Sequence, residues 1–399
     1  MDLSMTVAGV RFKNPLLAGS ANHVRGAEYT RRIIQSGVGG VVGKSVTDLE
    51  SMRQIKNARY AILDEYRRPC AGHIPRMYTF YSRTGSMESP EDWLRDLPDK
   101  LALARAHDVV LIGSVAAGKI ESWVSIARMM ADNGVPMIEL NLGCPHYERS
   151  PEKMGAQLGQ DPEACRQVVA MVRSEVRVPI IVKVTPQVAN LMPVVRAVQE
   201  AGADAVTVTN RFMGFAVDIE TGTPYTGSWA AVGGPWIAPL TLRWVAQCYR
   251  DTRLPILGSN GAADWSDVIE FLMAGASLVQ LVGRFMLTGP DLIPQLLTDL
   301  TAFMQRKGYG SIQEMVGVAA RAAVPYTELH RIPAQRMRLE SDLCNLCGNC
   351  LHACYYGALF QHGDEVGITN DCVGCGLCAV FCPTGALCVE AVAADPSGS

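Results

Sequence analysis

Eight short apolar segments in the first three hundred residues constrain the fold of this 399-residue chain more than any other feature. Longer stretches with helical periodicity separate them, such as PEACRQVVAMVRSEV at 162–176 and LMPVVRAVQEAG at 191–202. The segments are PLLAGS (15–20), GGVVGKSV (39–46), DVVLIGSVA (108–116), MIELNLGC (137–144), PIIVKVTP (179–186), AVTVTN (205–210), PILGSNG (255–261) and LVQLVGR (278–284). Eight strand–helix units of this length predict an α/β fold, a (β/α)8 TIM barrel over residues 1–310, rather than an open doubly wound sheet.

The stretch GVGGVVGKS at 37–45 looks like a nucleotide-binding loop but fails the spacing that such loops need. A phosphate-binding loop requires glycine where Val38 stands, and the dinucleotide fingerprint requires glycine where Val42 stands. The β-branched run around Lys44 indicates a strand that ends near the lysine, rather than a helix that begins there. Lys44 therefore has another role, and we expect that the chain alone does not use NAD(P)H.

Polar residues collect where the predicted strands end, which is where TIM barrels carry their chemistry. They are Lys44, Asn141, Cys144, Lys183 and Asn210. The seventh and eighth strands end in the glycine-rich turns 258–261 (GSNG) and 283–284 (GR). Turns use glycine for their own geometry, but two such turns after these two strands predict a phosphate-binding site.

Nine of the thirteen cysteines lie after residue 340. Eight of them form two successive C-x₂-C-x₂-C-x₃-C runs, the pattern of bacterial ferredoxins, in which the fourth cysteine of each run ligates the other cluster. We therefore predict one [4Fe–4S] cluster on Cys344, Cys347, Cys350 and Cys382, and a second on Cys372, Cys375, Cys378 and Cys354. Zinc sites use two separated pairs of ligands instead. Tyr355 replaces the proline that usually follows the first run, and Cys388 is left over as a small apolar residue.

These runs predict a small ferredoxin-like α+β domain at 336–399, joined to the barrel by a connecting segment at 311–335. Two clusters carry single electrons and have no substrate chemistry of their own. The barrel must therefore hold a group that exchanges electrons both singly and in pairs, and flavin is the common cofactor that does so. A phosphate site after strands seven and eight suits FMN.

The motifs ELNLGCPH, IIVKVTP and TVTN carry a resemblance to a known family. The barrel resembles the class 1 dihydroorotate dehydrogenases, and with the cysteine-rich tail the chain resembles the catalytic unit of the dihydropyrimidine dehydrogenases. The resemblance implies an FMN-dependent enzyme that transfers hydride between flavin N5 and a carbon–carbon bond of the substrate. It implies FMN contacts at Ala18, Gly19, Lys44, Asn141, Lys183, Asn210, Gly233, Gly234, Asn260, Gly261, Gly283 and Arg284.

Cys144 matches the catalytic acid/base of that family, which lies on a mobile loop over the substrate. A thiol with an ordinary pKa of about 8.5 is mostly protonated at neutral pH, so it can donate the proton that reduction of a C=C bond requires. Free cysteines are often only buried, and we assign that role to Cys70, Cys165 and Cys248.

Several expected substrate contacts differ from the family pattern. Lys119 stands near an expected asparagine, Gly143 replaces a serine, and Arg211 replaces a threonine. Together with Asn141 and Asn210, Lys119 and Arg211 are our predicted substrate-binding residues. The two added cations favour an anionic, carboxylate-bearing substrate that is not a pyrimidine, unless they face solvent or pair with acids such as Glu121 and Glu148.

Composition bounds the partners. The net charge of −3 and the 19% of charged residues indicate neither a nucleic-acid partner nor an anionic membrane surface. No apolar run suggests a membrane span, so we expect a cytoplasmic protein. The family pattern implies a separate FAD- and NAD(P)H-binding subunit or a ferredoxin, and we expect a homo-oligomer. A barrel that is only a flavin scaffold for electron transfer stays an alternative. The arginine-rich segment at 50–100 either caps the pocket or packs at a subunit interface.

Overall fold

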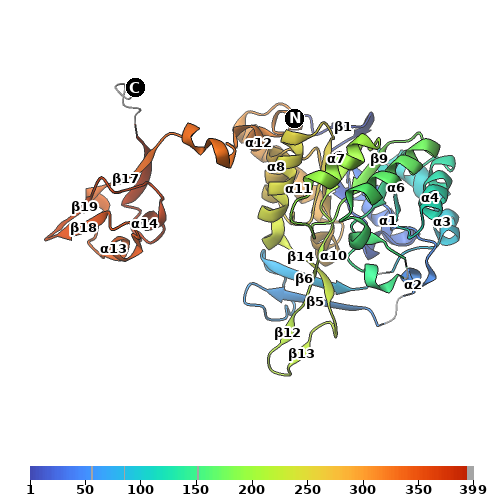
Figure 1. Cartoon of the computed structure of the whole chain (residues 1–399), viewed down its shortest axis with the longest axis horizontal. Coiled ribbons are helices and arrows are strands. Elements are labelled where there is room, and N and C mark those ends of the chain that lie inside the picture. The colour runs from blue at the N-terminus through green and yellow to red at the C-terminus, as the bar shows by residue number, and fades with distance from the viewer. Residues whose placement is uncertain (55–56, 85, 151, 393–399) are drawn as a thin grey trace. The chain divides into compact units, whose positions relative to one another are not determined.

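The structure is a computed structural model that describes residues 1–54, 57–84, 86–150 and 152–392. The chain divides into two compact units, Met1–Ala322 and Ala323–Ser399. Figure 1 labels the helices and strands of both units, which are described separately below.

Eight parallel strands of the first unit close into a barrel, in the order β10-β15-β16-β3-β4-β7-β8-β9. They are β3 (Leu16–Ala18), β4 (Gly40–Val42), β7 (Val110–Val115), β8 (Met137–Asn141), β9 (Ile180–Lys183), β10 (Ala205–Val208), β15 (Ile256–Ser259) and β16 (Leu278–Leu281). Each strand lies within one of the eight apolar segments, so the predicted TIM barrel is confirmed. Nearly every residue of these strands is buried, because the barrel interior and the surrounding helices cover both faces.

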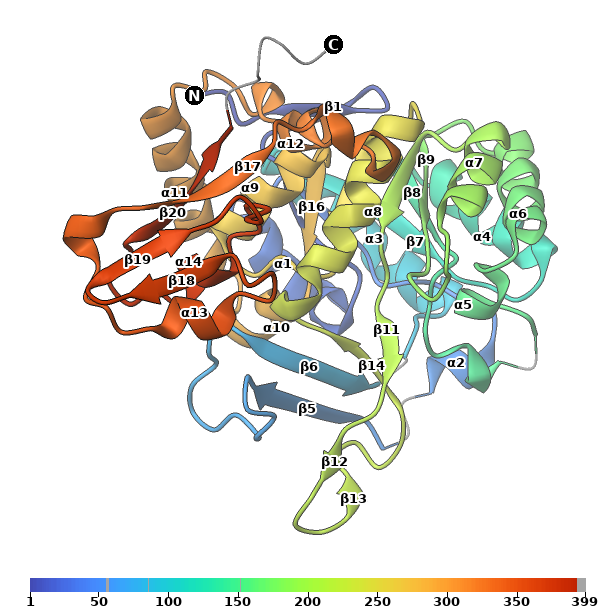
Figure 2. The same cartoon turned by 60° about the vertical axis from the view of Figure 1, so that its left-hand side comes forward.

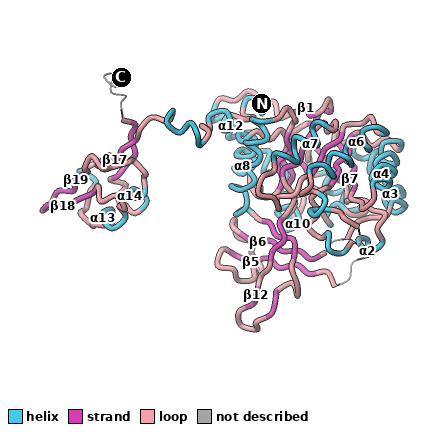
Figure 3. Tube along the Cα trace, viewed as in Figure 1, coloured by secondary structure: helices cyan, strands magenta, loops and turns pink. Residues whose placement is uncertain are grey.

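Helices follow the strands and surround the barrel, as the tube in Figure 3 shows. The longer ones are α1 (Ala27–Gln35), α3 (Pro90–Ala106), α4 (Ile120–Asp132), α6 (Pro162–Glu175), α7 (Met192–Glu200), α8 (Ala238–Asp251), α9 (Trp265–Ala274) and α11 (Leu292–Lys307). The shorter ones are α2 (Glu50–Arg53), α5 (Gly155–Leu158), α10 (Gly283–Thr288) and α12 (Val318–Ala322). α6 begins at Asp161, whose carboxylate accepts the backbone N–H of Glu163 and Ala164, with Pro162 in the first turn. Within the described residues, no helix is long and apolar enough to cross a membrane.

A four-stranded antiparallel sheet, here called the cap sheet, joins segments that are far apart in the sequence (Figure 2). Its order is β11 (Phe212–Gly214), β14 (Ala230–Gly233), β6 (Tyr78–Arg83) and β5 (Arg59–Asp64). The hairpin β12 (Val217–Asp218) and β13 (Thr223–Pro224) extends from it, and β1 (Met5–Val7) pairs with β2 (Val10–Phe12) elsewhere in the unit. The cap sheet therefore brings part of the 50–100 segment beside the loop that follows β10.

The second unit is a small α+β fold with two halves of similar construction. β17 (Gln335–Leu339) pairs with β20 (Leu387–Ala391), and β18 (Leu359–His362) pairs with β19 (Glu365–Ile368). One short helix contains the third cysteine of each run, α13 (Asn349–Ala353) in the first and α14 (Leu377–Val380) in the second. The core contains Met337, Ala353, Leu359, Cys378 and Leu387, with further cysteines packed against it. This arrangement confirms the predicted ferredoxin-like fold.

Candidate functional site

A pocket with about 1080 Å³ of empty space opens at the carboxyl ends of the barrel strands. The loops after β3, β4, β8, β10, β15 and β16 line it, and β6 and β14 of the cap sheet complete it. Tyr78, Phe80 and Ser82 of β6 are in the lining, so the 50–100 segment does cap the pocket.

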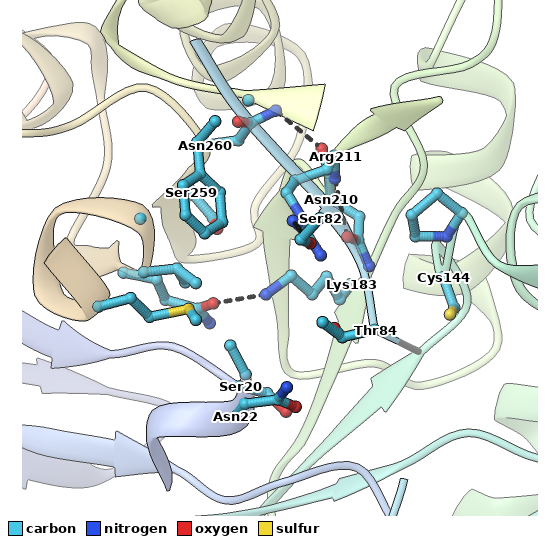
Figure 4. A pocket seen from close by; sticks show the side chains of 18 of the residues that line it. Ser20, Asn22, Ser82, Thr84, Cys144, Lys183, Asn210, Arg211, Ser259 and Asn260 are labelled. Carbon is cyan, nitrogen blue, oxygen red and sulfur yellow. Dashed lines mark hydrogen bonds between the residues drawn. The ribbon is translucent and has the colours of Figure 1, made fainter. Parts of the chain in front are cut away.

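Two asparagines are fixed in orientation at the ends of β8 and β10. Asn210 donates its side-chain amide to Asn141 Oδ1 over 2.9 Å, and the amide of Asn141 donates to Ser45 Oγ over 3.3 Å. Asn260 Nδ2 donates to the carbonyl of Asn210 over 3.1 Å. The structure thus brings the predicted residues Asn141, Asn210 and Asn260 into one network at the pocket wall, and Figure 4 shows Asn210 and Asn260 with neighbouring side chains.

A buried polar layer lies in the barrel at the floor of this pocket. Lys183 Nζ donates to Gln280 Oε1 over 2.6 Å and lies 3.6 Å from Glu139 Oε1. Glu139 is fully buried, and its other carboxylate oxygen accepts hydrogen bonds from Thr207 and Gln280. Burial lowers the pKa of Lys183, while the charge of Glu139 opposes that shift. Lys183 is therefore held in place by a paired, hydrogen-bonded anion.

The sequence prediction missed Glu139 and Gln280. Each is a polar residue inside an apolar strand, and Glu139 lies two positions before Asn141 in β8. Residues two apart in a strand point to the same face, so the alternation of β8 contained a signal that Glu139 faces inward with Asn141. Gln280 is likewise a polar residue inside an apolar run, LVQL, and this pattern also indicated a polar side chain within the barrel.

Lys44 lies after β4, where no helix begins, and lines the pocket. Burial lowers its pKa to about 8, with nearby Cys144 and Glu88 opposing the shift and Arg211 and Arg25 adding to it. The position of Lys44 is that of a strand-end lysine, as the failure of the phosphate-loop spacing predicted.

Cys144 lies in the pocket wall on the loop after β8, and only 6% of its surface is exposed. In Figure 4 it occupies one side of the pocket, with Ser259 and Asn260 on the other. Cys70, Cys165 and Cys248, which the sequence leaves without a catalytic role, are absent from the lining among the described residues.

The two predicted substrate cations have different surroundings. Arg211 follows Asn210, lines the pocket, and donates from Nη1 to Ser82 Oγ over 2.5 Å. Lys119 lies outside the lining, precedes α4, keeps 62% of its side chain exposed, and lies 3.9 Å from Glu152. The structure therefore brings Arg211 to the pocket but not Lys119, which faces solvent and pairs with an acid, although with neither of the two acids considered from the sequence.

The glycine-rich turns surround the end of the pocket formed by β15, β16 and β14. Gly233, Gly234, Asn260, Gly261 and Gly283 are all in the lining. A Cβ on Gly261 would lie 2.7 Å from the backbone of Ala238, and its φ of +135° also favours glycine. Arg284 Nη1 is buried with no hydrogen-bond partner in the described part of the chain. The backbone amides of these turns fit a phosphate group, and Arg284 follows Gly283 directly although it lies outside the lining, so the residues present fit FMN.

Ala18 and Gly19 lie at the end of β3, beside rather than in the lining. Ala18 is fully buried in the strand, and a Cβ on Gly19 would lie 2.6 Å from Val282 Cγ2. The neighbouring residues Ser20, Ala21 and Asn22 reach the pocket instead. Of the predicted cofactor contacts, Ala18, Gly19 and Arg284 are therefore the three outside the lining.

The cysteines of the second unit lie close to one another, and the two crossed ligand sets stay a prediction. Cys344, Cys347, Cys350 and Cys382 line one small cavity. Burial raises the pKa of Cys378, and the charges of Cys354, Cys375 and Cys350 raise it further, so cysteines of both predicted sets lie near Cys378. Backbone N–H groups of Met337 and Ala358 point at Cys372 Sγ (3.4 Å) and Cys354 Sγ (3.3 Å), as donors to cluster thiolates do.

As the side chains stand, no group of three or more His, Cys, Asp or Glu within the described residues converges tightly enough for a metal ion. A four-iron cluster is larger than a single ion, so its ligands surround a wider space. The shared cavity and the N–H donors fit such a group, and the ligand sets stay a prediction.

Comparison with known proteins gives matches over both units. The family model described as dihydroorotate dehydrogenase matches residues 2–304, and the 4Fe–4S binding domain matches residues 366–388. The chain is 31% identical to "Dihydroorotate dehydrogenase B (NAD(+)), catalytic subunit" of Caldicellulosiruptor bescii, over 79% of this chain and 99% of the relative. It is 29% identical to "NAD-dependent dihydropyrimidine dehydrogenase subunit PreA" of Escherichia coli K12, over 98% of this chain and 95% of the relative.

Proposed function

This chain belongs to the dihydroorotate dehydrogenase family and is an oxidoreductase acting on CH–CH groups with a ferredoxin-like 4Fe–4S domain, and we propose that Cys144 is its proton donor and acceptor. The observation that carries the proposal is the position of Cys144 in the wall of the strand-end pocket, with Lys44, Lys183, Asn141 and Asn210 in the same lining. The E. coli relative, which matches almost the whole chain, favours a pyrimidine-type ring as the substrate.

Bound FMN would supply a site that exchanges a hydride with the substrate and single electrons with iron–sulfur clusters. The glycine-rich turns and Arg284 would hold its phosphate. Lys44 and Lys183 would place ammonium groups where negative charge develops when the cofactor is reduced. Asn141 and Asn210, whose orientations are fixed by the hydrogen bonds described above, would hold carbonyl groups of the ring or of the substrate.

In the reducing direction, the π bond of the substrate breaks and two C–H bonds form. One carbon receives the hydride, and the neighbouring carbon receives the proton from Cys144 Sγ. The thiolate that remains lies near Lys44, whose pKa the Cys144 charge raises, so the ammonium group stabilises it until water returns the proton. In the oxidising direction the same thiolate removes a proton.

The electron route in this proposal runs through two [4Fe–4S] clusters on the eight cysteines of the second unit. Both relatives are named as subunits of NAD-dependent enzymes, and this chain has no dinucleotide fingerprint. We therefore propose a separate FAD- and NAD(P)H-binding subunit, or a ferredoxin, as the electron partner. About eight irons per chain, and no rapid bleaching of the purified chain by NADH, are the expected results.

Replacing Cys144 tests the proposed chemistry. Cys144→Ala should lower substrate turnover by at least about a hundredfold, since general acid–base catalysis typically contributes about 10²–10⁴-fold. FMN content and reduction of the flavin by dithionite should stay unchanged. Cys70→Ala, outside the pocket lining, is the matched control and should keep full turnover. Uracil, thymine and their dihydro forms are the first substrates to assay, and unchanged turnover in Cys144→Ala would contradict the proposal.

A further inference from the structure

The charges that line the pocket are unbalanced. Lys44, Lys183 and Arg211 all line it, and the described lining contains no aspartate or glutamate. Lys183 has its counter-ion beneath the floor, in Glu139. Lys44 has Glu88 as an acidic neighbour. Arg211 differs from both, because no carboxylate in the described part of the chain lies within ion-pair distance of its guanidinium.

The ionisable groups around Arg211 supply no carboxylate in the described part of the chain, and two of them are lysines. Burial lowers the pKa of Arg211, with Cys144 and Tyr60 opposing the shift, and the charge of Arg211 in turn lowers the pKa of Lys44 and Lys183. Among the residues that the structure describes, its guanidinium donates a hydrogen bond to Ser82 Oγ on β6 and to no other group. Since arginine stays protonated in proteins, the cation is partly desolvated and uses only one of its five N–H donors. A buried charge without a counter-ion is costly, and a bound anion removes that cost.

FMN does not account for this cation. The glycine-rich turns that fit the phosphate lie on the other side of the pocket from Cys144, as Figure 4 shows for Asn260 and Cys144. The negative charge of a reduced flavin has Lys44 and Lys183. Arg211 lies near Cys144, the residue that exchanges a proton with the substrate in the proposed function. The unmatched positive charge is thus placed where the substrate binds.

We propose that Arg211 and Ser82 form a subsite for an oxyanion, a carboxylate or a phosphate group, attached to the unsaturated skeleton of the substrate. Ser82 holds one side of the guanidinium, which leaves its remaining donors for a two-point contact with the anion. The subsite selects among substrates of the same ring type by charge. This inference rests on the proposed function, because it takes the space beside Cys144 to be the substrate position.

Orotate and uracil are matched probes, since they share a ring and differ by one carboxylate. Their dissociation constants are measured on the FMN-loaded full chain from the change in flavin absorbance. We expect the parent protein to bind orotate at least about tenfold more tightly than uracil. Arg211→Gln should weaken orotate about 30-fold or more, the factor for truncating one partner of a buried charge pair, and should change uracil less than about twofold. Arg211→Lys should give an intermediate loss, because it keeps the charge but not the two-point geometry.

Acetate and inorganic phosphate distinguish the two kinds of oxyanion without relying on the ring. Whichever is recognised should compete with orotate or perturb the flavin spectrum in the parent, and should lose that effect in Arg211→Gln. Arg250→Gln, at an exposed position of α8, is the control and should behave as the parent. A role for Arg211 only as a brace between the barrel and the cap sheet would lower thermal stability without changing the orotate-to-uracil ratio.

Two results overturn the subsite: the same orotate-to-uracil ratio in parent and Arg211→Gln, or no response of the parent to any of the anions. The proposed function fails separately, through unchanged turnover in Cys144→Ala. If Cys144→Ala loses turnover as expected but Arg211→Gln keeps the parent's orotate-to-uracil ratio, the subsite is refuted and the proposed function stands. If Cys144→Ala keeps full turnover but Arg211→Gln loses the preference for orotate, the anion subsite stands and the acid–base role of Cys144 is refuted.

Discussion

The two units of the chain place their cofactor residues in opposite environments. In the barrel, the candidate site lies on a large apolar core of fully buried strands, and its polar groups are tied to one another by hydrogen bonds. In the second unit, five residues form the core, and Cys347 and Cys375 are exposed. The comparison suggests that the barrel folds around its site, whereas the ferredoxin-like unit folds around its clusters.

Removal of iron should produce the largest difference between the two units. A unit of this size has too little core for high stability alone, and metal binding supplies folding free energy where ligands are otherwise separate. Iron chelation under reducing conditions, without denaturant, should therefore unfold residues 323–392 and leave the barrel folded. Hydrogen exchange read by peptide should show lost protection only in that range.

Two variants sharpen the iron result. Cys347→Ser removes a predicted ligand and should lower both iron content and protection of the second unit. Cys388→Ser changes the leftover cysteine, whose thiol donates to the carbonyl of Arg338 at 3.7 Å, and should keep the parent's iron content. Full protection of residues 323–392 in iron-free protein would show that the small core suffices.

Glu139→Ala tests the barrel side of the comparison. The substitution leaves Lys183 buried without its counter-ion, and removing one partner of a buried ion pair costs about 3–5 kcal/mol. The free energy of unfolding of the barrel should fall by that amount in urea titrations, while the iron content stays constant. Glu175→Ala is the matched control: Glu175 pairs with Arg128 at the surface, and its loss should change stability by less than about 0.5 kcal/mol.

The parts of the site that the sequence predicts are those that strand periodicity places. Lys44, Asn141, Lys183 and Asn210 come at or just after the ends of apolar runs, and closure of the barrel brings such ends together whatever the loops do. The crossed cysteine sets are predicted from ligand spacing in the same way, and they stay a prediction.

The cap sheet could not be predicted by that reasoning. β6 and β14 pair with Val232 opposite Tyr81, so the partner of each strand lies far away in the sequence and neither segment alternates cleanly. No sequence pattern therefore predicted that Ser82 lines the pocket, or that it contacts Arg211. The prediction that Lys119 contacts the substrate was wrong for a related reason. Lys119 precedes α4, but its exposed side chain lies near Glu152, which belongs to another loop.

The smallest expected effect is the decrease in the free energy of unfolding of the barrel that results from burying the Lys44 ammonium group. The folded protein has a Lys44 pKa of about 8, below the ordinary value of about 10.4, so the unfolded chain binds more protons between these two pH values. Stability must then rise with pH across that window, and the cost of burying the ammonium group is fully present below pH 8. In flavin-free protein, the free energy of unfolding should increase by up to about 1 kcal/mol from pH 8 to pH 9 through this group.

Lys44→Met should remove this rise, whereas Lys307→Met, at an exposed position, should keep it. An equal rise in parent and Lys44→Met would mean that the pocket accommodates the ammonium group without cost. If the rise is specific to Lys44, reduced flavin should suppress it, because a neighbouring negative charge restores the lysine pKa toward its ordinary value. The barrel would then resemble the ferredoxin-like unit in one respect: in each, binding of the cofactor stabilises charges that the empty protein holds at a cost.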